Sequence, residues 1–374
     1  MMYDLRTRRM LALVALALLT LHGAAQQGSL SAAVPKSPPA AGAMEFSDQP
    51  HFSIAGVTDW TAAGGHGSDT TLRTSESLAR ATAALTPQPG APNVSDAVSA
   101  EHRERATAQR HAAEAAEAAG DPLTAVREFE QAATLDPSEQ NEFEWGSELL
   151  MHRAIWQAEK VFLAGLDRYP HSMRMQTGLG AALFAGARYE DAATHLCTAS
   201  DLDPMNQEPY VLLGKIQIAA PDSLPCIIAK LQRFVRLYPQ SAQAYYLEAM
   251  AMLKQSLAAG SIRSATALLQ QATRIDPRCS DAYLELGVLA SQDKNFIAAI
   301  NYFQRAVTAD PQSADAHYRL AVAYDRTGNS AEARAELAIH DRLKREQAAK
   351  VEAQRRAVKQ FLFTQSGDPT LSKE

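Results

Sequence analysis

The sequence has few cysteines, few aromatic residues and no excess of positive charge. Among 374 residues there are three cysteines, aromatic residues make up 7%, and the formal net charge is -6. Three dispersed cysteines exclude a disulfide framework, and none has the CxxC spacing of a metal or redox pair. The negative charge argues against general nucleic-acid binding, which needs a basic surface to displace counterions. Few aromatics and abundant alanine favour closely packed helices over a sheet sandwich.

Catalytic signatures are missing too. The sequence contains no HExxH, GxSxG or GxxxxGK[ST] motif. Its histidines are scattered and have no companions at ligand spacing, so we expect no catalytic residue, no metal site and no cofactor. Cys197 and Cys226 are interpreted as small buried hydrophobes on helices. In an oxidising compartment one pair of cysteines could still form a disulfide.

The first 25 residues are typical of an export signal. A basic start is followed by the apolar run LALVALALLTL and then by small residues up to Ala25. This run is shorter than the ~20 residues that span a bilayer. We expect cleavage after Ala25 and a soluble mature protein, periplasmic or secreted, without stable membrane insertion. The alternative is an uncleaved N-terminal anchor.

Residues 26–100 are rich in Pro, Ala, Gly and Ser and are predicted to be a largely disordered linker. Within it, residues 45–85 carry Phe52 and Trp60, which could dock on the rest of the chain. This segment also contains GGHGSDTTLRTSE, with His66 and Asp69, and these are residue types that catalytic loops use. An enzyme or ligand-binding protein with its site in 45–85 is therefore an alternative to a scaffold without catalytic activity.

From about residue 101 the chain repeats itself. The pattern A-x3-F-x2-A-x4-P, with Phe or Leu at its centre, ends at prolines separated by 33, 34, 35, 38 and 34 residues: Pro137, Pro170, Pro204, Pro239, Pro277 and Pro311. Each proline stops a helix, because it lacks the N–H and disfavours helix just before it. A Leu-Gly pair such as Leu286-Gly287 lies in the helix before three of these patterns, and Trp145-Gly146 lies before a fourth; the small residue permits close helix approach.

This pattern resembles the tetratricopeptide repeat, a helix-turn-helix unit of about this length. The resemblance implies an all-α, right-handed α-solenoid of about seven repeats over residues 101–340, followed by a long C-terminal capping helix. Two units depart from the pattern. Pro221 and Pro225 interrupt the fourth, and about four extra residues near Gln255 predict a longer turn within the fifth.

Residues 341–374 are predicted to be a charged helix and tail. Between Arg334 and Lys359 there are eight Lys or Arg and four Asp or Glu. We interpret the helix as a solvated cap over the last repeat, with contact to an acidic partner or a membrane surface as the alternative. Phe361, Leu362 and Phe363 could fold back as an apolar plug.

The resemblance also implies binding through a concave face, which the first helix of each repeat lines. On it we expect mainly apolar and aromatic side chains with isolated charges, including Lys254, and a protein or peptide partner. The candidate groove residues are Phe143, Phe184, Lys215, Tyr246, Met250, Tyr318 and Arg319. Alternatively, the N-terminal linker or the C-terminal helix fills the groove.

Some family members capture chaperone C-termini with Lys, Asn and Arg on three successive first helices. Thr177, Val211, Tyr246 and Leu284 hold the corresponding positions here, which argues against that ligand. The sequence thus predicts an exported, non-enzymatic scaffold for protein–protein interaction, in a bacterium. An assembly factor for envelope or pilus machinery is an alternative that differs only in its partner.

Overall fold

The computed structural model describes residues 94–366. Over this range the chain forms fourteen α-helices and no strand, which confirms the all-α fold. The chain divides into two compact units, and the helices from Val98 onward lie in the first. The predicted signal, the linker and segment 45–85, including His66 and Asp69, lie outside the described residues.

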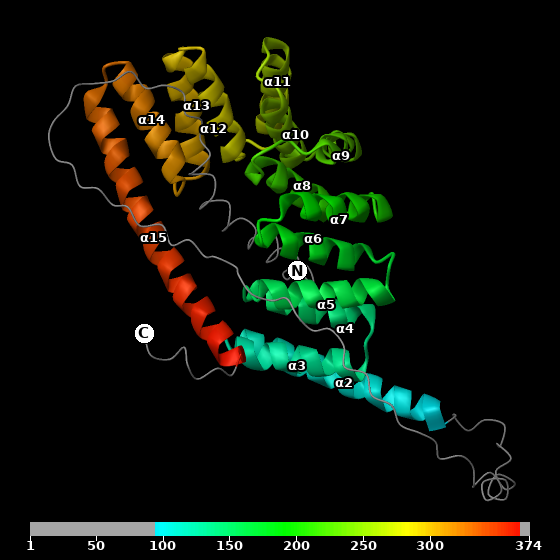
Figure 1. The fold of residues 1–374 in the computed structure, drawn as a ribbon. Helices are drawn as coiled ribbons and strands as arrows, with labels where there is room; N and C mark the ends of the chain where they lie inside the picture. Colours follow the sequence, from blue (N-terminus) through cyan, green and yellow to red (C-terminus); the bar gives the residue numbers. More distant parts are fainter. Residues whose placement is uncertain (1–93, 367–374) are drawn as a thin grey trace, which may run out of the picture. The chain divides into compact units, whose positions relative to one another are not determined.

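The fourteen helices form seven successive pairs, as the repeat predicts, and neighbouring pairs pack against one another in chain order (Figure 1). We call the earlier helix of each pair the first helix and the later one the second helix. The pairs are α2 (Val94–Ala118) with α3 (Pro122–Leu135), α4 (Glu139–Met151) with α5 (Ile155–Arg168), α6 (Met173–Ala185) with α7 (Tyr189–Leu202), α8 (Glu208–Ala219) with α9 (Pro225–Leu237), α10 (Ala242–Gln255) with α11 (Ala259–Ile275), α12 (Ser280–Gln292) with α13 (Phe296–Ala309), and α14 (Ala314–Arg326) with α15 (Ser330–Ser366).

The predicted helix stops lie at the repeat boundaries. Asp136 and Asp310 are the C-caps of α3 and α13 and have extended backbone, as the residue before a proline should. Serines cap three of the first helices, α6, α10 and α14, because a side-chain oxygen can accept a free N–H at the helix start. Ser172 accepts from the Met175 N–H (3.0 Å) in this way. Local sequence therefore sets where most units begin and end.

The repeated Ala-Phe-Ala positions form the core between the helices. Six second helices contribute side chains at these positions, and those side chains are at most 2% exposed. They are Ala125, Phe129, Ala132, Ala158, Phe162, Ala192, Leu196, Ala199, Leu231, Phe234, Ala265, Leu269, Ala272, Ala299, Phe303 and Ala306. Gly180 and Gly287 face Leu196 and Phe303 among these residues, whereas Gly214 faces Leu247 of the next first helix. A Cβ on Gly287 would lie 2.4 Å from Phe303 Cε1, so the predicted close approach is confirmed.

Five turns within the helix pairs share one backbone conformation that the sequence pattern does not reveal. Their central residues have positive φ, between 59° and 82°. They are Gly120, Arg153, Ala187, Lys294 and Gly328. Glycine adopts this left-handed conformation freely, whereas other residues usually pay about 1 kcal/mol or more in steric strain. The three non-glycine turns are therefore held in place by packing of the helices on either side.

The prediction for the fifth unit was wrong. Its turn contains only residues 256–258, as short as the equivalent turns, and the extra residues instead lengthen α11 to 17 residues. In the fourth unit the prolines do not interrupt a helix. Pro221 lies in the turn, and Pro225 starts α9, where its missing N–H would be unpaired in any case.

The last helix, α15, is one continuous helix of 37 residues. The predicted boundary at residue 340 therefore lies inside it. Its first part packs on α14, and its far end contacts α3 of the first pair. There Phe361 is 6% exposed, and its ring lies 5.2 Å from the ring of His152. This burial agrees with the predicted apolar plug, which closes on the start of the repeat array.

Candidate partner-binding face

The first helices place the predicted groove residues in two different environments. Phe143, Phe184 and Lys215 are buried, at 8%, 4% and 5% exposure. The two rings pack on rings of second helices, Phe143 on Phe162 (5.9 Å) and Phe184 on Tyr189 (6.0 Å between centroids). These two rings therefore belong to the core between helices in this structure.

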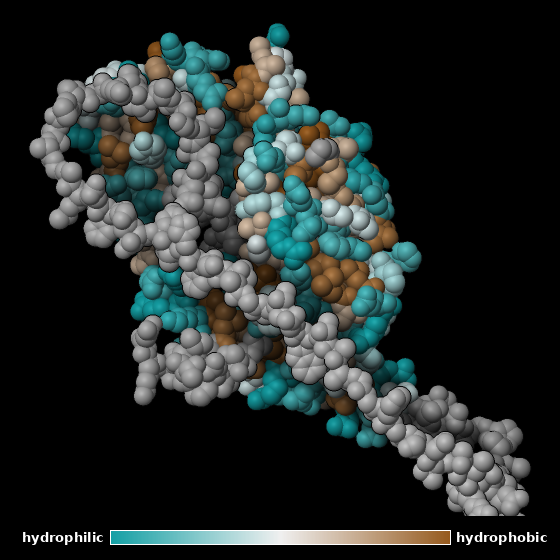
Figure 2. All heavy atoms as spheres, in the orientation of Figure 1, coloured by the Kyte–Doolittle hydropathy of each residue, from teal (hydrophilic) through white to brown (hydrophobic). Residues whose placement is uncertain are grey.

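The other predicted residues are more open. Tyr246, Met250 and Arg319 are half-buried, and Tyr318 is 47% exposed. Val322, one turn after Tyr318 on α14, is 39% exposed. Figure 2 shows apolar side chains gathered in patches between hydrophilic ones on the face that it draws. Tyr318 and Val322 on α14 are therefore the residues of the predicted face whose apolar side chains are exposed to solvent.

Carboxyl groups of α12 and α14 interact with Arg319, which is next to Tyr318 in the chain. Burial raises the pKa of Glu285 to about 7, an effect that the Arg319 guanidinium partly offsets. Burial, with the nearby charges of Asp281 and Glu285, also raises the pKa of Tyr246. Arg319 donates from Nε to Asp315 Oδ2 (2.8 Å). Because these residues come from three successive units, only the stacking of first helices brings them together.

A second pair of perturbed groups lies on α8. Burial raises the pKa of Glu208 to about 7 and lowers that of Lys215 to about 8, and the attraction between the two opposes both shifts only in part. The Oε1 atom of Glu208 is buried and has no hydrogen-bond partner among the described residues. Shifted pKa values of this kind are frequent at binding sites. The sequence pattern indicated Lys215 but not Glu208. The two residues are seven positions apart on α8, which places them on the same helix face.

Lys254 has a structural role rather than that of an isolated charge. Its Nζ donates to the carbonyls of Gln217 (2.6 Å) and Ala220 at the end of α8. A cation at a helix C-terminus pairs with carbonyls that the helix leaves free and is favoured by the helix dipole. Lys254 therefore ties the fifth unit to the fourth.

A cluster of titratable groups lies near the other end of the array. His152 Nε2 lies 3.2 Å from Glu117 Oε2 and 3.3 Å from Glu148 Oε1. Burial raises the pKa of Glu148, and for His152 the two carboxylates outweigh burial and raise its pKa. One side-chain N or O atom from each of the three residues lies within 4.8 Å of the other two. The scattered histidine positions in the sequence hid these companions, which come from α2 and α4, and the His152 ring also contacts Phe361.

Glu285 gives the stability of the protein a pH dependence with a definite sign. Its folded-state pKa is about 7 against an ordinary 4.5, so the folded protein holds the proton more tightly. Stability therefore falls as pH rises from about 4.5 to about 7 and then levels off. The full shift corresponds to about 3 kcal/mol, and we expect about 2 kcal/mol because the side chain is partly exposed.

A Glu285→Gln variant stays neutral at every pH, so near pH 8 it should exceed the parent by about 2 kcal/mol in free energy of unfolding. The difference should vanish near pH 4. Urea unfolding followed by circular dichroism across this range measures it. Glu332→Gln, at an exposed position on α15, controls for removal of a charge. Equal pH slopes for parent and Glu285→Gln would show that Glu285 does not carry the effect.

Among the described residues, no helix is both long enough and apolar enough to cross a membrane. The helix pairs, their shared turns and their common core define an α-helical repeat protein. Comparison with known families specifies which one. Sequence models described as tetratricopeptide repeat match residues 144–204 and 256–314, and another of the same description matches residues 290–354. The chain therefore contains tetratricopeptide repeats over residues 144–204 and 256–354.

Several solved structures are similar to this chain, and the first of those named here supports the same fold. A tetratricopeptide repeat protein from Parabacteroides merdae is 11% identical and has a TM-score of 0.52, covering 69% of this chain and 99% of its own. Yeast Tom70 is 18% identical with a TM-score of 0.46, covering 74% of this chain and 57% of its own. MamA is 23% identical with a TM-score of 0.37, covering 46% and 97%. No curated protein matches the sequence.

Proposed function

We propose that this protein is an exported, non-enzymatic scaffold that binds a protein partner through the first-helix face at α14, where Tyr318 and Val322 are exposed. The repeats themselves support a role in protein–protein interaction. The proposal that the partner binds at this place rests on Tyr318 and Val322, because they expose 47% and 39% of their surface. The residues of the repeat pattern, in contrast, are buried in the core. Aromatic side chains at such positions are the usual anchors of protein interfaces.

The charges beside this pair favour a partner segment with an apolar anchor and a basic group. Glu285 is held partly protonated near neutral pH because burial disfavours its charge. A lysine or arginine from a partner would restore the ionised form and gain a charge-assisted hydrogen bond. Export rests on the basic, apolar and small-residue order of residues 1–25.

Site-specific photo-crosslinking in the producing cell tests this proposal. A photoreactive phenylalanine in place of Tyr318 should give a defined adduct with another protein, and the same residue in place of Ile297 should not. Ile297 is a matched control, since it is 81% exposed but lies on the second helix α13. Tyr318→Ala with Val322→Ala should weaken capture at least ~5-fold, as for an interface anchor.

Sequencing this protein within the crosslinked adduct identifies its own N-terminus in the same experiment. A chain that begins at Gln26 supports export with cleavage after Ala25, and one that retains the first 25 residues contradicts that cleavage. Equal crosslinking at the Tyr318 and Ile297 positions, or undiminished capture by the double variant, would remove the face from consideration.

A further inference from the structure

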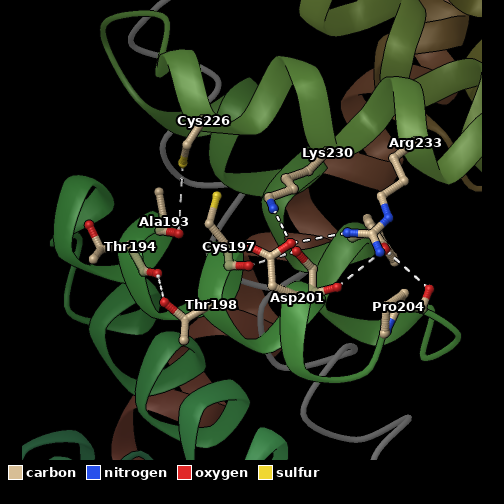
Figure 3. Close-up of polar contacts among 11 residues, drawn as sticks. Ala193, Thr194, Cys197, Thr198, Asp201, Pro204, Cys226, Lys230 and Arg233 are labelled. Carbon is tan, nitrogen blue, oxygen red and sulfur yellow. Dashed lines mark hydrogen bonds and ion pairs between the residues drawn. The ribbon is translucent and has the colours of Figure 1, made fainter.

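Two cysteines far apart in the sequence meet between α7 and α9 (Figure 3). Cys197 lies on α7 and is 9% exposed, whereas Cys226, in the first turn of α9, is exposed. The two thiols lie close enough for each to shift the pKa of the other. Cys226 Sγ also lies 3.9 Å from the carbonyl of Ala193, one turn before Cys197. The two sulfurs are therefore neighbours across the contact between consecutive second helices.

Ion pairs one turn further along fix this juxtaposition. Asp201 Oδ1, on α7, accepts from Lys230 Nζ (2.5 Å) and from Arg233 Nη1 (3.0 Å), both on α9. Figure 3 shows these two basic side chains converging on Asp201 beside the cysteines. Because Asp201 follows Cys197 by one turn and Lys230 follows Cys226 by one turn, the pairs hold the two helices in one register.

The two thiols differ in reactivity. The neighbouring Cys197 thiol, with help from the Lys230 charge, lowers the pKa of Cys226 to about 7 although partial burial opposes it. The neighbouring Cys226 and burial raise the pKa of Cys197. Thiolates are the nucleophiles in disulfide exchange. Cys226 is thus an accessible attacking sulfur, and Cys197 is a protected second thiol beside it, the arrangement found in redox-responsive pairs.

We propose that Cys197 and Cys226 form a reversible disulfide between α7 and α9, made by exchange with a small or protein disulfide. The Cys226 thiolate attacks the donor disulfide, forms a mixed disulfide and releases one donor thiolate. That thiolate takes the proton of Cys197, whose sulfur then attacks Cys226 sulfur and releases the second donor thiolate, which picks up a proton from water. Two electrons pass from the protein dithiol to the donor, which is reduced to two thiols.

The bridge closes a loop that contains α8 (Glu208–Ala219). This helix carries Glu208 and Lys215, and its C-terminal end is held by Lys254. In the reduced protein α8 can open locally without breaking a covalent bond, whereas the disulfide limits how far α7 and α9 can separate around it. Oxidation would therefore slow amide exchange in α8 and leave the distant α12 and α13 unchanged.

Oxidised glutathione applied to the reduced full chain provides the test. In the parent protein, alkylation and peptide mass mapping should find a Cys197–Cys226 disulfide, with Cys279 still alkylated as an internal control. Cys197→Ser should instead retain glutathione on Cys226, since no second thiol displaces it. Cys226→Ser should leave Cys197 free, because that thiol is buried. Dithiothreitol should return the parent to three free thiols.

The disulfide should also raise the thermal midpoint by about 5 °C over that of the reduced protein, and Cys279→Ser should show the same rise. Two free thiols at these positions after treatment would overturn the proposal. So would a disulfide to Cys279 or between two chains, or the absence of a glutathione adduct on Cys226 in the Cys197→Ser protein.

Discussion

Phe162→Ala should lower the free energy of unfolding by about 3–5 kcal/mol, the largest loss that we expect from a single substitution. The ring is fully buried and lies between two first helices. A Cβ on Gly146 would lie 2.7 Å from its Cε1 atom, and one on Gly178 would lie 2.4 Å away. Because both glycine backbones rest on the ring, the helices cannot easily collapse into the cavity that alanine would leave.

Urea unfolding measured by circular dichroism gives the size of this loss. Leu163→Ala is the matched control, because Leu163 is the next residue on α5 and is 45% exposed. It should cost less than about 1 kcal/mol. Apart from the contact of α15 with α3, units contact only their neighbours, so the Phe162 variant should also separate unfolding of the first two pairs from that of the later ones. Similar losses for the two variants would contradict this account of the core.

The core could be predicted from sequence because the repeat fixes it. Ala158, Phe162 and their equivalents recur at one spacing, and one helix period places them on the face toward the paired helix. The same reasoning could not decide whether extra residues near Gln255 lengthen a turn or a helix. Counting residues gives the insertion, but only the structure shows that it lengthens the start of α11, at residues 259–261.

The predicted face was harder to specify than the core. A first helix in such an array contacts its own second helix and the helices of both neighbouring units, so little of its circumference remains open. Residues one turn from the Leu-Gly pair, such as Phe143 and Phe184, can therefore turn into the core. The grouping of Tyr246, Glu285 and Arg319 depends on the stacking of three units, which a single sequence does not give.

Gly287→Val should destabilise the protein by about 3 kcal/mol, through overpacking rather than cavity formation. A Cβ at this position would lie 2.4 Å from Phe303 Cε1 and 2.5 Å from Cδ1. Phe303 is 2% exposed and packs against Leu320 and Ala323, so its ring has no free space to move into. The helices α12 and α13 must then separate, which removes the contact that the Leu-Gly pair permits.

Gly260→Val is the matched control, because Gly260 lies in the first turn of α11 with nothing within 4 Å of a Cβ. It should change the free energy of unfolding by less than about 0.5 kcal/mol. In the Gly287→Val background, Phe303→Leu should restore part of the lost stability by providing room for the valine, which gives a favourable coupling energy in a double-mutant cycle. If the losses in free energy of unfolding from Gly287→Val and Phe303→Leu were additive, the two residues would not compete for the same space. The Leu-Gly pair would then have a role other than close helix approach.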